Sequence, residues 1–182
     1  MKMECGYHVR ISGSVAICSV NTVSRIGVVV IVYTGGSFDL FHRGHVRLLK
    51  QCRDLEGGSN RVIVSLNTDE FIEQFKGMAP VCSFDERKEV LESCRYVDAV
   101  IPNIGATDSK PAILQARPDV VAIGSDWAPP RDYHAQMMFT AEWLEEQQIR
   151  LVFLNRTEGV SSSELRDRST RQQDNLRNTT TS

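Results

Sequence analysis

The chain of 182 residues lacks the features that mark nucleic-acid-binding and membrane-spanning proteins. No run of Lys and Arg exceeds a few residues, and the formal net charge is −2. We therefore expect neither nucleic acid nor a membrane surface as a partner. No apolar run approaches the length that crosses a bilayer. The apolar and charged fractions are ordinary for a globular protein.

Cysteine and histidine are scarce and scattered. The cysteines are odd in number and show no CxxC spacing: Cys5, Cys18, Cys52, Cys82 and Cys94. We expect no disulfide framework and no zinc site, and a reducing, cytoplasmic location. The four histidines are too few and too spread for a metal cage, so no residue is assigned as a metal ligand.

The length fits one domain. Residues Met1 to Arg25 mix polar residues with isolated apolar ones, and we expect a poorly ordered extension there. The folded domain is predicted over 26–168. The tail from Ser169 to Ser182 is polar with one leucine, and we expect it to be disordered because it can bury too little surface.

Apolar runs alternate with helical periodicity from Ile26 onward. The predicted strands are Ile26–Tyr33, Arg61–Leu66, Asp98–Ile101, Val120–Ile123 and Ile149–Leu154. Helices are predicted from near Arg43, from near Asp69, and over Asp85–Cys94, Lys110–Ala116 and Tyr133–Gln147. The side chains expected to point inward from two of them are Val90, Leu91, Cys94, Met137, Met138, Ala141 and Leu144. This alternation predicts an α/β fold: a doubly wound, Rossmann-like parallel sheet of five strands with helices on both faces.

The most informative stretch is GGSFDLFHRGHVRLL, from Gly35 to Leu49. Two glycines after a buried strand allow a sharp bend and a close approach to a ligand. The helix that follows points free amides back at the turn, which attracts phosphate. His42 and His45 add two potential proton or hydrogen-bond donors, so the stretch predicts chemistry on a nucleotide.

A second stretch, RTEGVSSSE from Arg156 to Glu164, follows the last strand and opens a helix. Ser161 and Glu164 fit a capping box, which alone indicates only a helix start. The same hydroxyls and amides can also hold phosphate, with Arg156 as a forked cation. Because the stretch follows the last strand of the predicted sheet, we favour a second phosphate site.

Together, GSFDLFHRGH and RTEGVSSS resemble the HxGH nucleotidylyltransferase superfamily, in particular its cytidylyltransferase branch and the glycerol-3-phosphate cytidylyltransferases. Further similar segments are FKGMAP, DERK, CRYVDAVIP and GSDW, so the resemblance covers Ile26 to Arg168. It implies a homodimer that transfers CMP from CTP to a small alcohol phosphate and releases pyrophosphate. It also implies Mg²⁺ bound mainly through the nucleotide phosphates.

The resemblance implies roles for particular residues. The implied catalytic residues are His42, His45, Lys76 and Arg156. The implied nucleotide-binding residues are Gly36, Ser37, Phe38, Asp39, Gly44, Asp126, Trp127, Thr157, Gly159, Val160, Ser161, Ser162 and Ser163. The implied substrate-binding residues are Lys76, Arg87, Arg95 and Lys110.

Several alternatives stay open at the level of sequence. Lys76 can also be a solvated loop lysine, although we favour a phosphate contact. Arg87 and Arg95 can equally be helix-surface charges, and Asp126 can cap a turn. Glycerol-phosphate enzymes tend to carry several lysines after the TDEF segment, and a tryptophan is expected after VIP. This chain has one lysine and no tryptophan at these places, which leaves the identity of the acceptor open. An adenylyltransferase of the same fold, using ATP on a sugar phosphate or cofactor precursor, is the first alternative. An inactive nucleotide-binding module is the second.

Overall fold

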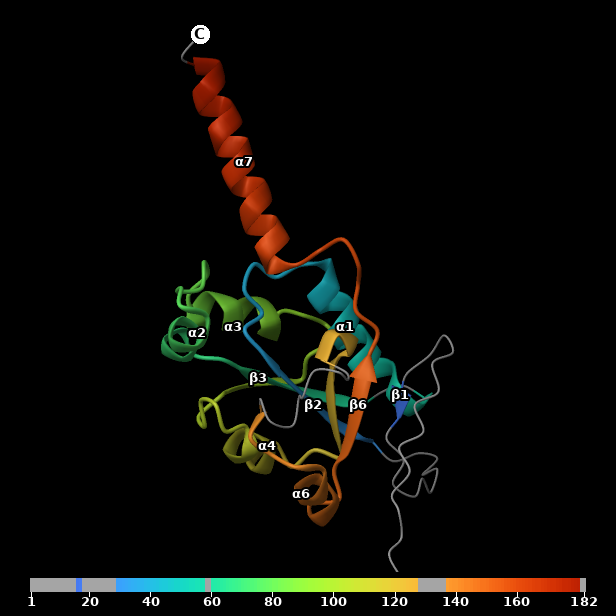
Figure 1. Ribbon diagram of the computed structural model, residues 1–182. Coiled ribbons are helices and arrows are strands. Elements are labelled where there is room, and N and C mark those ends of the chain that lie inside the picture. The colour runs from blue at the N-terminus through green and yellow to red at the C-terminus, as the bar shows by residue number, and fades with distance from the viewer. Residues whose placement is uncertain (1–15, 18–28, 58–59, 128–136, 181–182) are drawn as a thin grey trace, which may run out of the picture.

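The structure is a computed structural model that describes residues 16–17, 29–57, 60–127 and 137–180. Its centre is a six-stranded sheet with the strand order β1-β6-β5-β2-β3-β4 (Figure 1). The strands are β1 (Ala16–Ile17), β2 (Ile31–Gly36), β3 (Arg61–Leu66), β4 (Ala99–Pro102), β5 (Val120–Gly124) and β6 (Arg150–Leu154).

The five longer strands are all parallel, which confirms the predicted sheet. The first of them begins at Ile31 and continues through Gly36, a shift of several residues from the prediction. Strand β1 was not expected. It pairs antiparallel with β6 and lies inside the predicted N-terminal extension. The rest of that extension, residues 1–15 and 18–25, lies outside the described residues, so its expected disorder stays a prediction.

Helices follow the strands and cover both faces of the sheet (Figure 1). They are α1 (Arg43–Asp54), α2 (Asp69–Lys76), α3 (Phe84–Glu92), α4 (Lys110–Ala116), α6 (Ala141–Glu146) and α7 (Ser162–Thr180), with short 3₁₀ turns η1 (Leu55–Gly57) and η2 (Ser125–Trp127). Local signals fix the boundaries. The Thr68 hydroxyl accepts a hydrogen bond from the Phe71 amide at 3.2 Å, which starts α2. Gly77, with φ of +70°, ends it.

The core forms one layer on each face of the sheet. Val32 and Tyr33 are neighbours in β2 but belong to opposite layers, as the two-residue period of a strand requires. Helix α1 contributes Leu49 to the layer that contains Val32. Helix α4 contributes Ile113 to the layer that contains Tyr33. Both faces of the central strands are therefore covered, which leaves the strand ends as the place for a ligand.

Two predicted helices differ from the structure. Val90 is 45% exposed, not inward, because α3 turns Arg87 and Leu91 toward the interior. Met138 is 54% exposed, and the helix that buries Leu144 begins only at Ala141. The Thr140 hydroxyl, which accepts from the Trp143 amide at 3.1 Å, fixes that later start. The predicted start at Tyr133 lies outside the described residues.

The C-terminal segment also differs from expectation. Helix α7 continues to Thr180, whereas we expected disorder from Ser169. It extends away from the sheet (Figure 1), and the described side chains from 167 to 177 are exposed. The segment contains neither glycine nor proline, so nothing in its sequence stops a helix that Ser161 has started. Low hydrophobicity alone therefore did not predict the secondary structure of this segment.

Strand β2 lies at the point where the strand order reverses. From β2 the chain proceeds to β3 and β4 on one side, and later to β5 and β6 on the other. Open α/β sheets bind ligands outside the carboxyl ends of the strands at such a point. Gly36 ends β2 and Gly124 ends β5, so a site is expected between them.

Candidate active site

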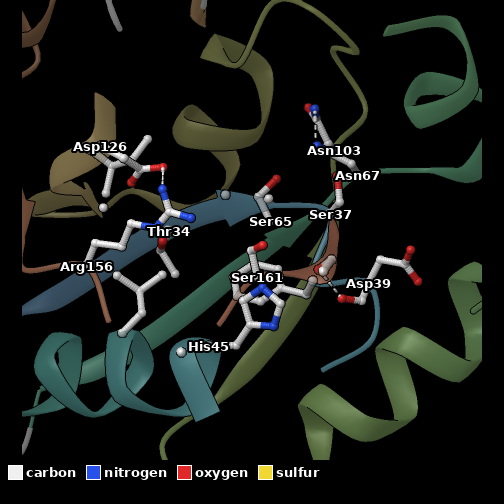
Figure 2. Close-up of a pocket in the computed structure, with 18 of the residues that line it drawn as sticks. Thr34, Ser37, Asp39, His45, Ser65, Asn67, Asn103, Asp126, Arg156 and Ser161 are labelled. Carbon is white, nitrogen blue, oxygen red and sulfur yellow. Dashed lines mark hydrogen bonds and ion pairs between the residues drawn. The ribbon is translucent and has the colours of Figure 1, made fainter. Parts of the chain in front are cut away.

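A cleft of about 380 Å³ opens at this edge of the sheet. Its walls come from the ends of β2, β3 and β5, from the start of α1, and from the segment that leads into α7. Figure 2 shows His45 and Ser161 together in its middle, with Asp126 and Arg156 at one end and Asn67 and Asn103 at the other. The volume falls in the usual range for small-molecule sites.

The two histidines are fixed at the start of α1. The His42 Nδ1 atom accepts a hydrogen bond from the Gly44 amide at 3.1 Å. The His45 Nδ1 atom accepts from the His42 amide at 3.4 Å. The two rings stack with their centroids 3.8 Å apart. Because both Nδ1 atoms are acceptors, each neutral ring carries its proton on Nε2, where it can be donated to a ligand.

Both imidazoles are held neutral. Burial is the main cause that lowers the pKa of His45 to about 3, with the nearby His42 ring and the Lys76 ammonium acting in the same direction. Burial is also the main cause that lowers the pKa of His42, with Arg156 adding to it. At pH 7 these residues are therefore hydrogen-bond donors rather than cations. This differs from a simple cationic phosphate site, in which charge would do most of the binding.

The turn between β2 and α1 does not use its glycines as expected. Gly35 and Gly36 lie in the strand, and the left-handed backbone falls instead on Phe38 and Leu40, each with φ of +48°. The Phe38 ring covers Gly36, where an added Cβ would lie 3.2 Å from it. Left-handed conformations at bulky residues are strained and occur mainly at functional sites.

The start of α7 packs directly against the start of α1. The Arg43 guanidinium donates to the Gly159 carbonyl oxygen at 3.1 Å. A Cβ added at Gly44 would lie 3.3 Å from the Val160 side chain. The Ser162 hydroxyl donates to the Asp39 carbonyl oxygen at 2.6 Å. The two stretches singled out in the sequence therefore form one site, as the sequence hypothesis required.

Ser161 starts α7, and its hydroxyl accepts from the Glu164 amide at 3.1 Å. This bond is one of the two hydrogen bonds that make up the predicted capping box. The Ser161 O–H and the next amides, those of Ser162 and Ser163, have no acceptor within the described part of the chain. They leave a helix start that can bind an anion.

Asp39 connects these segments and does not face a ligand with free oxygens. Its carboxylate accepts from the Val81 and Cys82 amides, each at 3.0 Å, and pairs with Arg166 of α7. These contacts outweigh the effect of burial and lower its pKa. Asp39 is therefore a buried acceptor that joins the turn to α7 and to the loop after α2. Its carbonyl, rather than its carboxylate, meets Ser162.

Two cations border the cleft on different sides. Lys76 is the last residue of α2, and its ammonium donates to the Ser37 hydroxyl at 3.2 Å. The Arg156 guanidinium lies 3.7 Å from the Asp126 carboxylate and is half exposed. Asp126 thus orients Arg156 beside the turn that follows β5. Both cations line the cleft that also contains His42 and His45.

Most predicted site residues do line the cleft, but six do not. The predicted residues absent from its lining are Trp127, Gly159, Ser163, Arg87, Arg95 and Lys110. Arg87 is only 2% exposed, and its guanidinium donates to the carbonyl oxygens of Ser37, Asn67 and Cys82. These contacts and an ion pair with Asp69 occupy the guanidinium beneath the cleft. Arg95 instead lies over the Tyr96 ring, 5.2 Å from its centroid.

The structure adds lining residues that sequence reasoning missed. The polar ones are Thr34, Ser65, Asn67, Asn103, Thr107 and Asn155, and the aromatic ones are Tyr33, Phe71 and Phe75. A signal for some of them was available. Ser65 and Asn67 lie at the carboxyl end of β3 and Asn103 just after β4, the edge where ligands bind in such sheets.

The described residues contain no cluster of three or more His, Cys, Asp or Glu that could hold a metal ion. The two carboxylates at the cleft, Asp39 and Asp126, are already paired with arginines. A magnesium ion at this site would therefore depend mainly on oxygens of a nucleotide. Among the described helices, none is both long and apolar enough to cross a membrane.

Comparisons with known proteins agree with this geometry. Residues 33–168 match the model of the family described as Cytidylyltransferase-like. The chain is 35% identical over 136 residues to a glycerol-3-phosphate cytidylyltransferase of Bacillus subtilis, covering 75% of this chain and 94% of that one. It is 32% identical over 142 residues to an FAD synthase of Pyrococcus horikoshii, covering 76% and 91%.

The fold has a solved counterpart. A lipopolysaccharide core biosynthesis protein of Thermoplasma volcanium matches with a TM-score of 0.54 at 20% identity, covering 70% of this chain and 96% of that one. This likeness concerns the fold alone. The family match covers residues 33–168, and the cytidylyltransferase relatives align over most of both chains. The chain therefore belongs to the cytidylyltransferase-like family and is a nucleotidyltransferase.

Proposed function

We propose that this protein transfers CMP from CTP to the phosphate of a small alcohol phosphate and releases pyrophosphate. The observation that carries the proposal is the meeting of two helix starts over one cleft. The first bears the Nε2–H groups of His42 and His45. The second bears Ser161 and the free amides that follow it. Arg156 lies at the same cleft.

The reaction needs no covalent enzyme intermediate. An oxygen of the acceptor phosphate attacks the α-phosphorus of CTP, and the bond from that phosphorus to the bridging oxygen breaks. The bridging oxygen leaves with the electron pair as part of pyrophosphate. Charge grows on the equatorial and leaving oxygens in the transition state. Catalysis is then mainly positioning and stabilisation of that charge.

The described side chains fit these roles. Neutral His42 and His45 donate Nε2–H bonds to oxygens around the α-phosphorus without trapping the product pyrophosphate by full charge. Arg156 and the start of α7 hold the β- and γ-phosphates. Lys76 contacts the phosphate oxygens from the opposite side, as a point charge on a flexible stem. A Mg²⁺ ion bound with the nucleotide would further neutralise the polyphosphate.

The choice of CTP and of a glycerol-phosphate-like acceptor rests on the similarity to glycerol-3-phosphate cytidylyltransferases. The FAD synthase relatives, at 32–37% identity, favour a second candidate: transfer of AMP from ATP to a different phosphorylated acceptor. The same two helix starts serve either triphosphate, because they contact phosphates and not the base.

A nucleotide and acceptor panel tests the proposal. Purified protein with Mg²⁺ is incubated with each of the four nucleoside triphosphates and with several phosphorylated alcohols, and pyrophosphate is followed. We expect turnover with CTP and an acceptor, and none with the other three nucleoside triphosphates. Turnover with ATP alone would establish the adenylyltransferase instead. No turnover with any pair would indicate a nucleotide-binding module without activity.

A further inference from the structure

The end of the cleft farthest from Arg156 contains a pair of asparagines (Figure 2). Asn67 directly follows β3, and Asn103 directly follows β4. The Asn103 Nδ2 atom donates to the Asn67 Oδ1 atom at 3.0 Å and to the Ala106 carbonyl oxygen at 2.8 Å. Both residues line the cleft, and Asn103 is only 7% exposed.

The hydrogen bonds fix the orientation of both amides. The Ala106 carbonyl can only accept, so the atom of Asn103 that faces it must be nitrogen. Asn103 then has to present its second N–H to Asn67, so the Asn67 atom in that bond must be oxygen. What remains is a defined pair: the Asn103 Oδ1 atom as acceptor and the Asn67 NH₂ group as donor.

Neither remaining group has a partner within the described part of the chain. The Asn103 Oδ1 atom is buried and makes no hydrogen bond. Leaving a buried carbonyl unpaired is costly, and native structures do so mainly where a ligand or water completes the bond. The backbone offers little room for relaxation, because the Asn67 carbonyl accepts from buried Arg87 at 2.9 Å and the Asn103 amide donates to Leu66 at 2.8 Å.

The surroundings indicate what that ligand carries. The stacked rings of Phe71 and Phe75, 5.7 Å apart, give this end an apolar wall. Lys76, which follows Phe75 at the end of α2, also lines the cleft and can take a phosphate. A neutral donor and a neutral acceptor, fixed side by side, suit hydroxyl groups, each of which both donates and accepts. Neither amide carries a positive charge, so the pair would not stabilise a second negative charge on the ligand.

We propose that Asn67 and Asn103 are the acceptor-specificity residues, and that they select a polyol phosphate by binding hydroxyl groups of its carbon chain. The proposal rests on the function proposed above and makes its acceptor more specific. Asn103 accepts a hydrogen bond from a hydroxyl, and Asn67 donates one to a hydroxyl oxygen. The acceptor phosphate then lies toward Lys76, within reach of the α-phosphate over the histidines.

The test compares glycerol 3-phosphate with propyl phosphate, which lacks both hydroxyls. The wild-type protein should prefer glycerol 3-phosphate by about 100-fold or more in kcat/KM, since a site built to bind hydroxyls rejects analogues without them. Asn67→Ala and Asn103→Ala should each reduce this ratio at least tenfold. Loss of mere structure would lower kcat/KM for both acceptors equally and leave the ratio unchanged.

Controls keep the outcome interpretable. Asn67→Ala leaves the bond from Asn103 to Ala106 in place, so it tests the proposal even if Asn103→Ala does not fold. Ile104→Ala alters a side chain that is 63% exposed in the same loop, outside the cleft lining, and should leave the ratio at the wild-type value. The affinity for CTP alone should stay unchanged in all three variants.

Calorimetric titration of both acceptors, with a non-hydrolysable CTP analogue present, separates this proposal from the proposed function. If no turnover is seen but glycerol 3-phosphate binds better than propyl phosphate, and the variants abolish the preference, the function fails and the subsite stands. A wild-type ratio near one, or a wild-type ratio preserved in both asparagine variants, overturns the subsite.

Discussion

Replacing His45 tests how the cleft stabilises a transition state. The His45 Nδ1 atom accepts from the His42 amide at 3.4 Å, so its Nε2–H is free for a phosphate oxygen. Loss of one such preorganised donor costs about 3 to 4 kcal/mol, which corresponds to about 10²- to 10³-fold in kcat. We therefore expect His45→Ala to lower kcat by about 10²-fold or more, with kcat/KM falling equally.

The ring also contributes to packing, and the design must separate this contribution from catalysis. His45 stacks on His42 and contacts the rings of Phe38 and Phe41. His45→Leu fills the space without a donor, whereas His45→Gln fills it and offers an amide N–H. We expect Gln to recover at least tenfold in kcat over Leu, measured as pyrophosphate release at saturating substrates. Thermal melts verify that both fold. Wild-type turnover by His45→Leu would refute the donor role.

Other perturbations follow from the same contacts. Gly44→Ala should lower kcat at least tenfold, because the new Cβ would lie 2.9 Å from the His42 ring and displace it; an unchanged rate would contradict this in steady-state assays. Asp39→Ala should lower the free energy of unfolding by about 3 kcal/mol in urea titrations, since buried donors lose their acceptor; a loss under about 1 kcal/mol would argue against its joining role. Lys76→Met should raise the Kd for CTP, measured by calorimetry, because a cation at the phosphates is lost. An unchanged Kd would indicate that Lys76 does not contact the phosphates of CTP. His45 has a folded pKa of about 3 against an ordinary value of 6.5, so the unfolded chain binds more protons between these limits. Wild-type stability should therefore fall more steeply than that of His45→Leu as the pH drops from 6.5 to 3, and parallel curves would contradict the lowered pKa.

The sequence predicted the sheet well because its signal is local. Buried parallel strands are continuous apolar runs, and α4 was predicted with its observed bounds, Lys110–Ala116. The site at the first helix was predictable for the same reason, since His42, Gly44 and His45 lie within one turn. Contacts between distant segments, such as Arg43 with Gly159, could only be inferred from the rule that carboxyl strand ends meet at one edge.

Failures arose where a residue's role depends on its burial. Arg87 reads as a surface charge or a substrate ligand in a charged helix, and only the fold shows the backbone carbonyls around it. Asp39 lines the cleft as the motif predicted, but only the fold shows that its carboxylate is occupied by Val81, Cys82 and Arg166. The contact between Asn103 and Asn67 could not be predicted from the sequence, because the two residues are 36 positions apart.

A crystal structure with bound CTP tests the central claim most directly. We expect one triphosphate to span both helix starts, with the His42 and His45 Nε2 atoms on oxygens near the α-phosphorus. Arg156, the Ser161 hydroxyl and the Ser162 amide should contact the β- or γ-phosphate. A triphosphate that contacts only one helix start, or that lies outside this cleft, would contradict the account.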